Sequence, residues 1–291
     1  MKKPIVISLI NHKGGTGKTL STLNLAEALK NVLAKKMKVN GKILLIDNDP
    51  QASLTSFFYN IEEELEPNDT IIALYNHEPF FTKDIILQTS IKDVDLVANM
   101  FSCGTKEKAL SSLLDGNFRL KDFIKKFCGN YNFILIDNSP FISAFTNNAF
   151  IASDAIIIPT IPTRLSIIGI KEILKNIQAV QERVNSELTL LGILINMLDE
   201  RIKTHQVASE LLVRAFGETV FHTSVHHSAA LQKAEERKLS IAAHDRTARA
   251  YKEYYTLATE ILARYNPGIK FNSHRAIHSK FGLSTEENNN G

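Results

Sequence analysis

The chain has 291 residues, of which 44% are hydrophobic, and a formal net charge of +3. This hydrophobic fraction suffices for a full core. A net charge this small does not by itself indicate a nucleic-acid-binding protein. The two cysteines exclude a disulfide framework and lack metal-ligand spacing, so we expect reduced thiols and a cytoplasmic location. No stretch approaches about 18 consecutive apolar residues, so no membrane span is expected.

A phosphate-binding loop is the first feature along the chain. Residues 4–10 form an apolar run typical of a buried parallel strand, and leucines at helical spacing predict a helix from Lys18 to about residue 36. Between them lies the sequence Asn-His-Lys-Gly-Gly-Thr-Gly-Lys-Thr at 11–19, the phosphate loop. A glycine-rich turn between a strand and a helix directs backbone N–H groups at phosphate. Lys18 can add a point charge, and Thr19 can hand its hydroxyl to Mg²⁺.

The loop departs from the standard pattern G-x-x-x-x-G-K-[ST], because His12 stands in place of the first glycine. Residues 13–19 instead resemble the deviant Walker A loop, K-G-G-x-G-K-[ST], of ParA/MinD-type ATPases. The resemblance implies ATP and Mg²⁺ as cofactors and a homodimer when ATP is bound, in which Lys13 crosses to the partner's nucleotide. The ATP-binding residues that it implies in this loop are Lys13, Gly14, Gly15, Thr16, Gly17, Lys18, Thr19 and Leu20.

A second buried strand, from residue 43, ends in Asp47-Asn48-Asp49-Pro50-Gln51. Ligands of doubly wound sheets lie at the carboxyl ends of strands, which places Asp47 beside the phosphate loop. The segment matches the D-x-D-P-Q of the same family, and the match implies that Asp47 positions the attacking water or a water on Mg²⁺. For Asp49 we favour a helix N-cap. The family continues with Gly-Asn, whereas this chain has Ala52 and Ser53.

The middle of the chain predicts a helix at 70–75, a strand at 94–98 and one helix over 110–127. The apolar strand at 133–137 then ends in Asp137, a Walker B candidate that would accept a hydrogen bond from a Mg²⁺-bound water. The family usually has D-x-P-P here. This chain has Asp137-Asn138-Ser139-Pro140, and the missing proline is expected to loosen the loop without removing a charge.

Further strands at 156–160 and 190–196 flank an amphipathic helix at 167–184. The second strand ends in Asn196, and the resemblance implies that its amide pairs with adenine, although capping of the following turn is an alternative. The expected fold class is α/β, a doubly wound and mostly parallel sheet flanked by helices, of the P-loop NTPase type with a deviant Walker A loop. Residues 1–265 are expected to form a single ATPase domain.

The C-terminal third, 201–265, is basic. From residue 201 to 283 there are 13 Lys and Arg against 7 Asp and Glu. The order expected here is a helix at 206–216, a short strand at 219–221, a loop entering L-x-x-A at 231–234, and a helix at 248–265. This order resembles Soj-type partition ATPases and implies a dimer-dependent surface for non-specific double-stranded DNA. The candidate contacts are Arg201, Lys203, Lys233, Arg237, Arg246 and Arg249.

Two features weaken this DNA surface. His227 and Ala230 stand where relatives carry arginines, and Arg249 lies four residues before Glu253, a spacing typical of an ordinary surface pair. The histidines at 222, 226 and 227 suggest a metal site, but we favour the interpretation that they lie in a solvated polar loop.

The resemblance as a whole implies an ATP-dependent DNA segregation ATPase, nucleoid-associated in the cytoplasm. Its ATP-bound dimer would bind DNA, and hydrolysis stimulated by a ParB-like centromere-binding protein would release it. One alternative is a MinD-like or cargo-positioning ATPase acting on a membrane or a protein assembly, and another is a metabolic P-loop enzyme. The tail, 266–291, is polar, and we expect it to be partly disordered.

Overall fold

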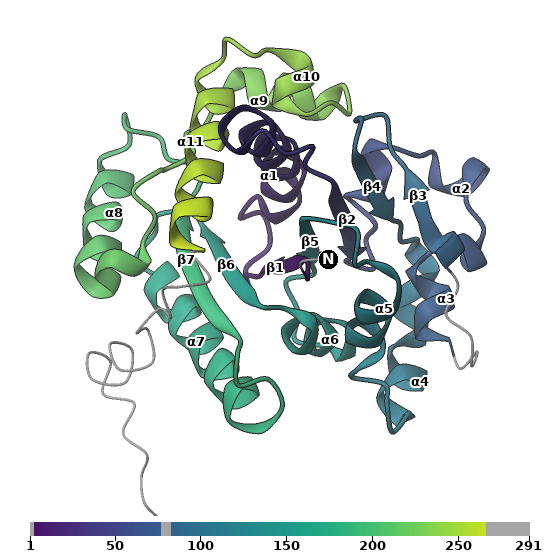
Figure 1. Cartoon of the computed structure of the whole chain (residues 1–291). Coiled ribbons are helices and arrows are strands. Elements are labelled where there is room, and N and C mark those ends of the chain that lie inside the picture. The colour runs from purple at the N-terminus through teal and green to yellow at the C-terminus, as the bar shows by residue number, and fades with distance from the viewer. Residues whose placement is uncertain (1–2, 77–82, 266–291) are drawn as a thin grey trace, which may run out of the picture.

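Seven strands form one sheet at the centre of the computed structural model, which describes residues 3–76 and 83–265 (Figure 1). The sheet order is β3-β4-β2-β5-β1-β6-β7, and every pairing is parallel except that of β3 with β4. The strands are β1 (Ile5–Leu9), β2 (Ile43–Asn48), β3 (Ile86–Gln88), β4 (Val94–Val97), β5 (Phe133–Asn138), β6 (Ala155–Thr160) and β7 (Thr189–Ile195). The expected fold class is confirmed.

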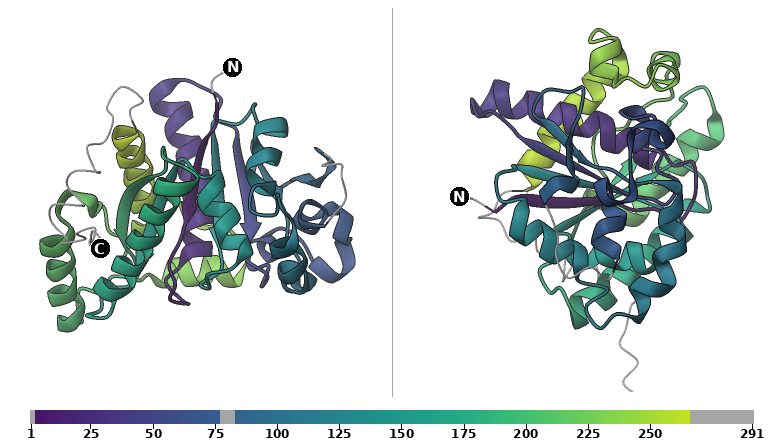
Figure 2. Two further views of the ribbon diagram at one scale, coloured as in Figure 1. Left: turned by 90° about the horizontal axis from the view of Figure 1, so that it is seen from below. Right: turned by 90° about the vertical axis from the view of Figure 1, so that its right-hand side faces the viewer.

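Helices cover both faces of the sheet (Figures 1 and 2). One face packs against α1, α9, α10 and α11, and the other packs against α3, α5, α6, α7 and α8. The helices are α1 (Lys18–Val32), α2 (Ile61–Glu64), α3 (Ile71–Tyr75), α4 (Glu107–Ser112), α5 (Arg119–Phe127), α6 (Ala144–Ala152), α7 (Ser166–Arg183), α8 (Lys203–Phe216), α9 (Ala229–Glu236), α10 (Ile241–His244) and α11 (Arg249–Arg264). The short 3₁₀ and π segments are η1 (Leu33–Met37), η2 (Thr55–Phe57), η3 (Pro67–Asp69), η4 (Lys83–Ile85), η5 (Phe101–Lys106) and η6 (Gly217–Thr219).

The strand register brings the chemically important residues to one edge. In β5, Asp137 lies opposite Leu9 of β1 on one side and Asp47 of β2 on the other. Since successive side chains alternate between the faces of a sheet, both carboxylates point to the α1 face, and the residues that follow them, Asn48 and Asn138, point to the opposite face. The phosphate loop begins one residue after β1, at this same edge.

Polar contacts fasten the C-terminal helices to α1. Tyr254 of α11 shares a hydrogen bond of 3.2 Å with Ser21, and Asn24 accepts a bond of 2.7 Å from the backbone N–H of Ile241 at the start of α10. Both contacts are buried. The helix that follows the phosphate loop, α1, therefore anchors the last three helices, α9, α10 and α11.

Two expected elements are wrong. The helix predicted over 110–127 is two helices, because the chain turns between α4 and α5 at Gly116, where a Cβ would meet the carbonyl oxygen of Leu110 at 1.9 Å. The strand predicted at 219–221 is a single bridge between Ile193 and Val220 that follows the turn η6. The N–H of Phe221 bonds the carbonyl of Ile193 at 2.9 Å, but the next bond to β7 comes only from Val225, to Ile195 at 3.0 Å, so the ladder does not continue.

Sequence reasoning also missed the edge strand β3. Its three residues have no clear alternation, and they pair antiparallel with β4. Within the described ranges, no helix combines the length and the apolar character needed to cross a bilayer. The expected tail at 266–291 lies outside the described residues.

Candidate nucleotide-binding site

The phosphate loop adopts a conformation that depends on its glycines. Gly15 and Gly17 have φ angles of 72° and 77°, in the left-handed region that glycine tolerates best. A Cβ on Gly17 would meet Nδ2 of Asn196 at 2.4 Å, whereas one on Gly14 would meet nothing within 4 Å. The loop is therefore tightly packed only where it enters α1.

Lys18 lies buried against the loop that it belongs to. Its Nζ donates to the carbonyl oxygens of Asn11 and Lys13, at 3.2 and 3.4 Å. Burial lowers its pKa, and the nearby carboxylates of Asp137 and Asp49 oppose that shift. Two neutral carbonyl acceptors compensate a buried ammonium only weakly, so the group is poised to exchange them for phosphate oxygens.

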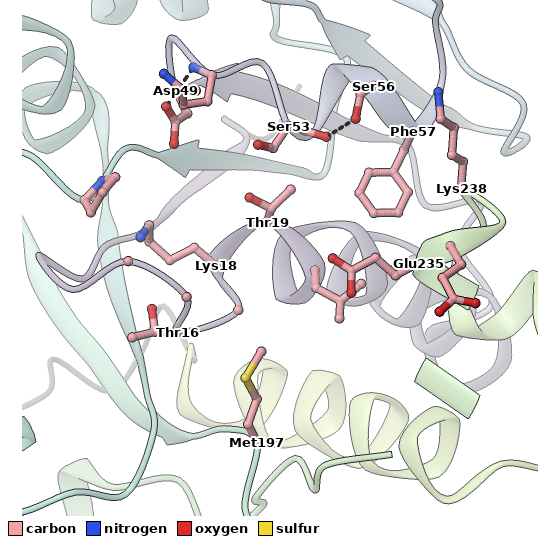
Figure 3. A pocket seen from close by; sticks show the side chains of 17 residues that line it. Thr16, Lys18, Thr19, Asp49, Ser53, Ser56, Phe57, Met197, Glu235 and Lys238 are labelled. Carbon is pink, nitrogen blue, oxygen red and sulfur yellow. Dashed lines mark hydrogen bonds between the residues drawn. The ribbon is translucent and has the colours of Figure 1, made fainter. Parts of the chain in front are cut away.

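A cavity of about 610 Å³ opens over the loop and the first turn of α1 (Figure 3). This volume lies within the range of small-molecule sites. Its walls come from loop residues 14–20, from the segment after β2, and from Pro140, Met197 and the end of α9. In Figure 3 Lys18 and Thr19 face it from the loop, and Phe57, Glu235 and Lys238 close its other end.

Asp137 is a buried carboxylate that its neighbours compensate only in part. Neither of its oxygens has a hydrogen-bond partner among the described residues. Burial raises its pKa well above the ordinary value, the neighbouring Asp47 adds to the shift, and Thr19 and Lys18 oppose it. An orphaned carboxylate beside a threonine hydroxyl fits Mg²⁺, which retains several waters and needs only one or two carboxylates. Thr19, Asp47 and Asp137, the expected metal-site residues, therefore lie at one edge of the sheet.

Asp47 is held differently. One of its oxygens accepts bonds of 2.8 and 2.7 Å from the N–H and hydroxyl of Thr55, and the other accepts a bond of 3.2 Å from the N–H of Asp49. Burial raises its pKa to about 7, and the bonds from Thr55 oppose this shift. In this conformation Asp47 fastens the loop that follows β2. Thr55 was missed by sequence reasoning, since a threonine eight residues beyond Asp47 carries no recognisable signal.

The loop after β2 also differs from expectation. Asp49 does not cap a helix; its Oδ1 accepts from the N–H of Gln51 at 2.9 Å and closes a tight turn. Ala52 follows in the left-handed region, with φ 51°. A glycine would adopt this conformation without strain, which gives a physical reason for the glycine that the related ATPases carry at this position.

Lys13 and Asn196 differ in their exposure to solvent. The Lys13 side chain is exposed. Asn196 is buried beneath the loop and donates to the carbonyl of Thr16 at 2.8 Å and to the hydroxyl of Ser21 at 3.2 Å. Its Oδ1 accepts from the N–H of Met197, as the capping alternative expects. Asn196 thus supports the loop, and its adenine contact stays a prediction.

The six candidate DNA contacts divide into two sets. Arg201 pairs with Asp199 at 2.7 Å, and Arg249 pairs with Glu253 at 2.7 Å, which confirms the surface pair expected for Arg249. The other four are exposed, and no ion pair joins them to any described part of the chain. They are Lys203, Lys233, Arg237 and Arg246.

The loop histidines take part in this charged cluster. His226 contacts Glu253 through Nδ1 at 2.6 Å and Glu200 through Nε2 at 2.8 Å, and Arg249 lies 2.7 Å from the same Nε2. The described ranges contain no group of three or more His, Cys, Asp or Glu residues arranged to hold a metal ion. His226 therefore joins its loop to α11, and it is partly buried and paired with carboxylates rather than solvated as expected.

The fold and the cavity together define a phosphate-loop nucleotide-binding protein. A protein-family model described as "AAA domain" matches residues 4–190. The sporulation initiation inhibitor protein Soj of Bacillus subtilis is 28% identical over 258 residues, 89% of this chain and 98% of the relative. The chromosome partitioning protein ParA of Myxococcus xanthus is 28% identical over 264 residues, 90% and 89% of the two chains. The chain belongs to the AAA domain family, among the ATPases of the ParA/Soj type.

Solved structures share the fold. A variant of McdA of Cyanothece, in complex with ATP, superposes with a TM-score of 0.76 at 18% identity, covering 90% of this chain and 98% of that one. A plasmid partition protein of Borrelia burgdorferi gives 0.70 at 22%, with 90% and 100% covered. Cobyrinic acid a,c-diamide synthase of Mycobacterium smegmatis, with an ATP analogue and magnesium, gives 0.73 at 20%, with 92% and 98% covered. A synthase and a partition protein thus have one fold, so the fold alone does not decide between them.

Alanine substitutions at the loop glycines should destabilise the ligand-free protein in a graded order. Gly14→Ala should be nearly neutral, because the space is open and its φ is not positive. Gly15→Ala should cost about 1 kcal/mol for the left-handed backbone, and Gly17→Ala should cost more because of the added clash with Asn196. Urea unfolding measures the order, and equal losses at all three positions would contradict this geometry.

Stability should also fall with rising pH. The pKa of Asp47 is raised from 3.8 to about 7 in the folded chain. The stabilisation from its proton is complete below the unfolded pKa and is lost as the pH rises through the folded one, a difference of roughly 4 kcal/mol. Asp47→Asn should make the decline in urea-unfolding free energy between about pH 4 and 8 shallower, and the raised pKa of Asp137 accounts for the decline that remains. The exposed Asp122→Asn should not, and a wild-type curve as flat as that of Asp47→Asn would refute the assignment.

Proposed function

We propose that the chain is an ATP-dependent DNA segregation ATPase whose ATP-bound homodimer binds DNA and whose hydrolysis releases it. The observation that carries this proposal is the pairing of a buried lysine with an exposed one around a single phosphate loop. Lys18 faces the cavity of its own chain, whereas Lys13 extends into solvent beside Gly14. The exposed lysine is suited to bind a second anionic ligand, one that is held by another copy of the chain.

Apolar side chains around the loop support a second copy at this edge. Phe141 and Ile142 follow β5 and are 72% and 61% exposed, and Leu165 and Ile168 follow β6 and are 71% and 61% exposed. β5 and β6 are the two neighbours of β1, so these residues flank the phosphate loop on both sides. Exposed apolar groups gathered at one edge are typical of an interaction surface.

The residues of the chain divide the chemistry between them. The loop N–H groups and Lys18 would hold the phosphates, Thr19 and Asp137 would hold Mg²⁺ and its waters, and Asp47 would orient the attacking water. When bound, Mg²⁺ neutralises charge on the phosphates. The Thr55 bonds to Asp47 keep the loop after β2 closed. Loss of the γ-phosphate removes the shared charge that holds two copies together, which makes self-association depend on nucleotide state.

DNA binding is the less specified part of the proposal. Three of the four candidate contacts without ion partners, Lys233, Arg237 and Arg246, lie on α9, at its end and in the turn after α10, and both helices are packed on α1. A dimer doubles the number of phosphate contacts, so DNA affinity rises steeply with self-association. A ParB-like partner that stimulates hydrolysis would complete the cycle, with the protein associated with the nucleoid.

Substitution of the two lysines should separate the two roles. Lys18→Ala should abolish ATP binding, because the phosphates lose their buried cation. Lys13→Ala should still bind ATP but should neither dimerise nor hydrolyse it. Sedimentation velocity with ATP and a fluorescent-nucleotide titration measure both effects, with Lys42→Ala, in the loop before β2, as the control. A Lys13→Ala dimer as stable as that of the wild type would refute the role in trans.

Removal of the unpaired cations should weaken DNA binding in a salt-dependent way. For the triple variant Lys233→Ala, Arg237→Ala and Arg246→Ala, the slope of log affinity against log salt should fall by about 0.9 for each DNA phosphate that the variant no longer neutralises. Lys125→Ala with Lys126→Ala, on α5 of the opposite layer, is the control. The measurement is DNA binding with ATP, with ADP and without nucleotide across a salt series; equal binding in all three states would contradict the proposed switch.

The same assays address the alternatives. Co-sedimentation with liposomes but not with DNA, in the presence of ATP, would favour a MinD-like or cargo-positioning ATPase. ATP turnover that requires a small-molecule substrate and is indifferent to DNA would favour a metabolic enzyme.

A further inference from the structure

The ends of the three central strands are joined by a buried amide network on the face opposite the carboxylates. Asn48 at the end of β2 donates to Oδ1 of Asn138 at the end of β5, at 2.8 Å. Asn138 donates to the carbonyl of Leu9, the last residue of β1, at 3.4 Å, and to that of Ile136 at 3.1 Å. Asn48 and Asn138 are 1% and 0% exposed. The network therefore reaches the last residue of each strand that leads into the nucleotide site.

Two helices complete this network. The hydroxyl of Tyr75 in α3 donates to Oδ1 of Asn48 at 2.6 Å, and Asn48 donates a second bond to the carbonyl of Phe145 in α6 at 2.9 Å. The rings of Tyr75 and Phe145 contact each other, with centroids 5.2 Å apart. Each amide thus makes two donor bonds and one acceptor bond, in an interior where an unsatisfied polar group would be costly.

The position of the two amides beside Asp47 and Asp137 matters more for function than their contribution to the stability of the fold. Asn48 directly follows Asp47 and precedes the loop at 49–54, and Asn138 directly follows Asp137 and precedes the loop at 139–143. Asp47 and Asp137 are register partners on the other face of the same two strands. The next register pair, Asn48 and Asn138, is the last of the backbone ladder between β2 and β5, and the side-chain hydrogen bond between the two amides adds a second link where that ladder ends.

We propose that Asn48 and Asn138, held by Tyr75, are positioning residues for ATP hydrolysis. Their side-chain hydrogen bond reinforces the end of the β2–β5 ladder beside Asp47 and Asp137, and it makes the two loops that follow move as one unit. The inference rests on the proposed ATP hydrolysis at the cavity. Apolar side chains at these two positions would pack but would not link the two strand ends in a fixed direction. Small displacements of positioned groups can reduce rates by as much as about 100-fold.

The test replaces the network as a whole. In the triple variant Asn48→Leu, Asn138→Leu and Tyr75→Phe, the three linked polar side chains become apolar groups of similar size, which limits the loss of stability. A fluorescent ATP analogue measures binding, steady-state turnover at saturating ATP and Mg²⁺ measures kcat and KM, and circular dichroism measures melting. We expect binding within about threefold of the wild type and a kcat lowered at least about tenfold.

The matched control is Asn148→Leu. Asn148 is also a fully buried asparagine with three hydrogen bonds, but these go to the turn before α5, to the first turn of α5 and to α6 itself, and none reaches a strand end. It should lower the melting temperature while kcat stays within about twofold of the wild type. If Asn148→Leu lowered kcat as much as the triple variant, or if the triple variant kept the wild-type kcat, the positioning role would be refuted.

Tyr75→Phe alone keeps the test decisive if the triple variant does not fold. It removes a single hydroxyl and leaves the ring contact with Phe145, so we expect normal ATP binding and a kcat reduced about threefold. An unchanged kcat would refute the proposal. If the wild-type protein failed to hydrolyse ATP, with DNA present or absent, both the proposed function and this inference would be refuted. If the wild-type protein hydrolysed ATP and the variants did so equally well, only this inference would be refuted.

Discussion

The parallel pairing of β2, β5 and β1 determines where the functional groups of the chain lie. It brings Asp47, Asp137 and the start of the phosphate loop to one edge of the sheet, although they lie far apart in sequence. Hydrogen bonds between strands fix that arrangement before any ligand is considered. The helices then follow, since α1 continues the phosphate loop and the C-terminal helices are built on α1.

The site concentrates buried charge that the protein alone does not compensate. Lys18 is held by carbonyl oxygens, and Asp137 has no hydrogen-bond partner among the described residues. Burial disfavours the charged form of each group, as the lowered pKa of Lys18 and the raised pKa of Asp137 indicate. A polyphosphate supplies negative charge for Lys18, and its metal ion supplies positive charge for Asp137. Ligand binding therefore relieves the electrostatic cost of burying these two groups.

The sequence predicted what local pattern and spacing can encode. The phosphate loop, the strands ending in Asp47 and Asp137, and the alternation of strands and helices were visible because each has a local signature. What depends on distant contacts was not visible. Thr55 holds Asp47 only after the loop folds back, Asn196 turns beneath the loop to meet Thr16, and the carbonyl of Val220 is taken by Arg264 from the far end of the chain. The break at Gly116 carried a local glycine signal, but the helical periodicity on either side obscured it.

The proposed switch requires that Lys13 reach the nucleotide of a second copy of the chain. A crystal structure with a non-hydrolysable ATP analogue and Mg²⁺ would show whether it does. We expect two chains face to face across the edge that carries Phe141 and Leu165, with each Lys13 Nζ within hydrogen-bonding distance of the partner's phosphates. A Lys13 side chain folded onto the phosphates of its own chain, in a monomer or in a dimer built on another surface, would contradict this mechanism.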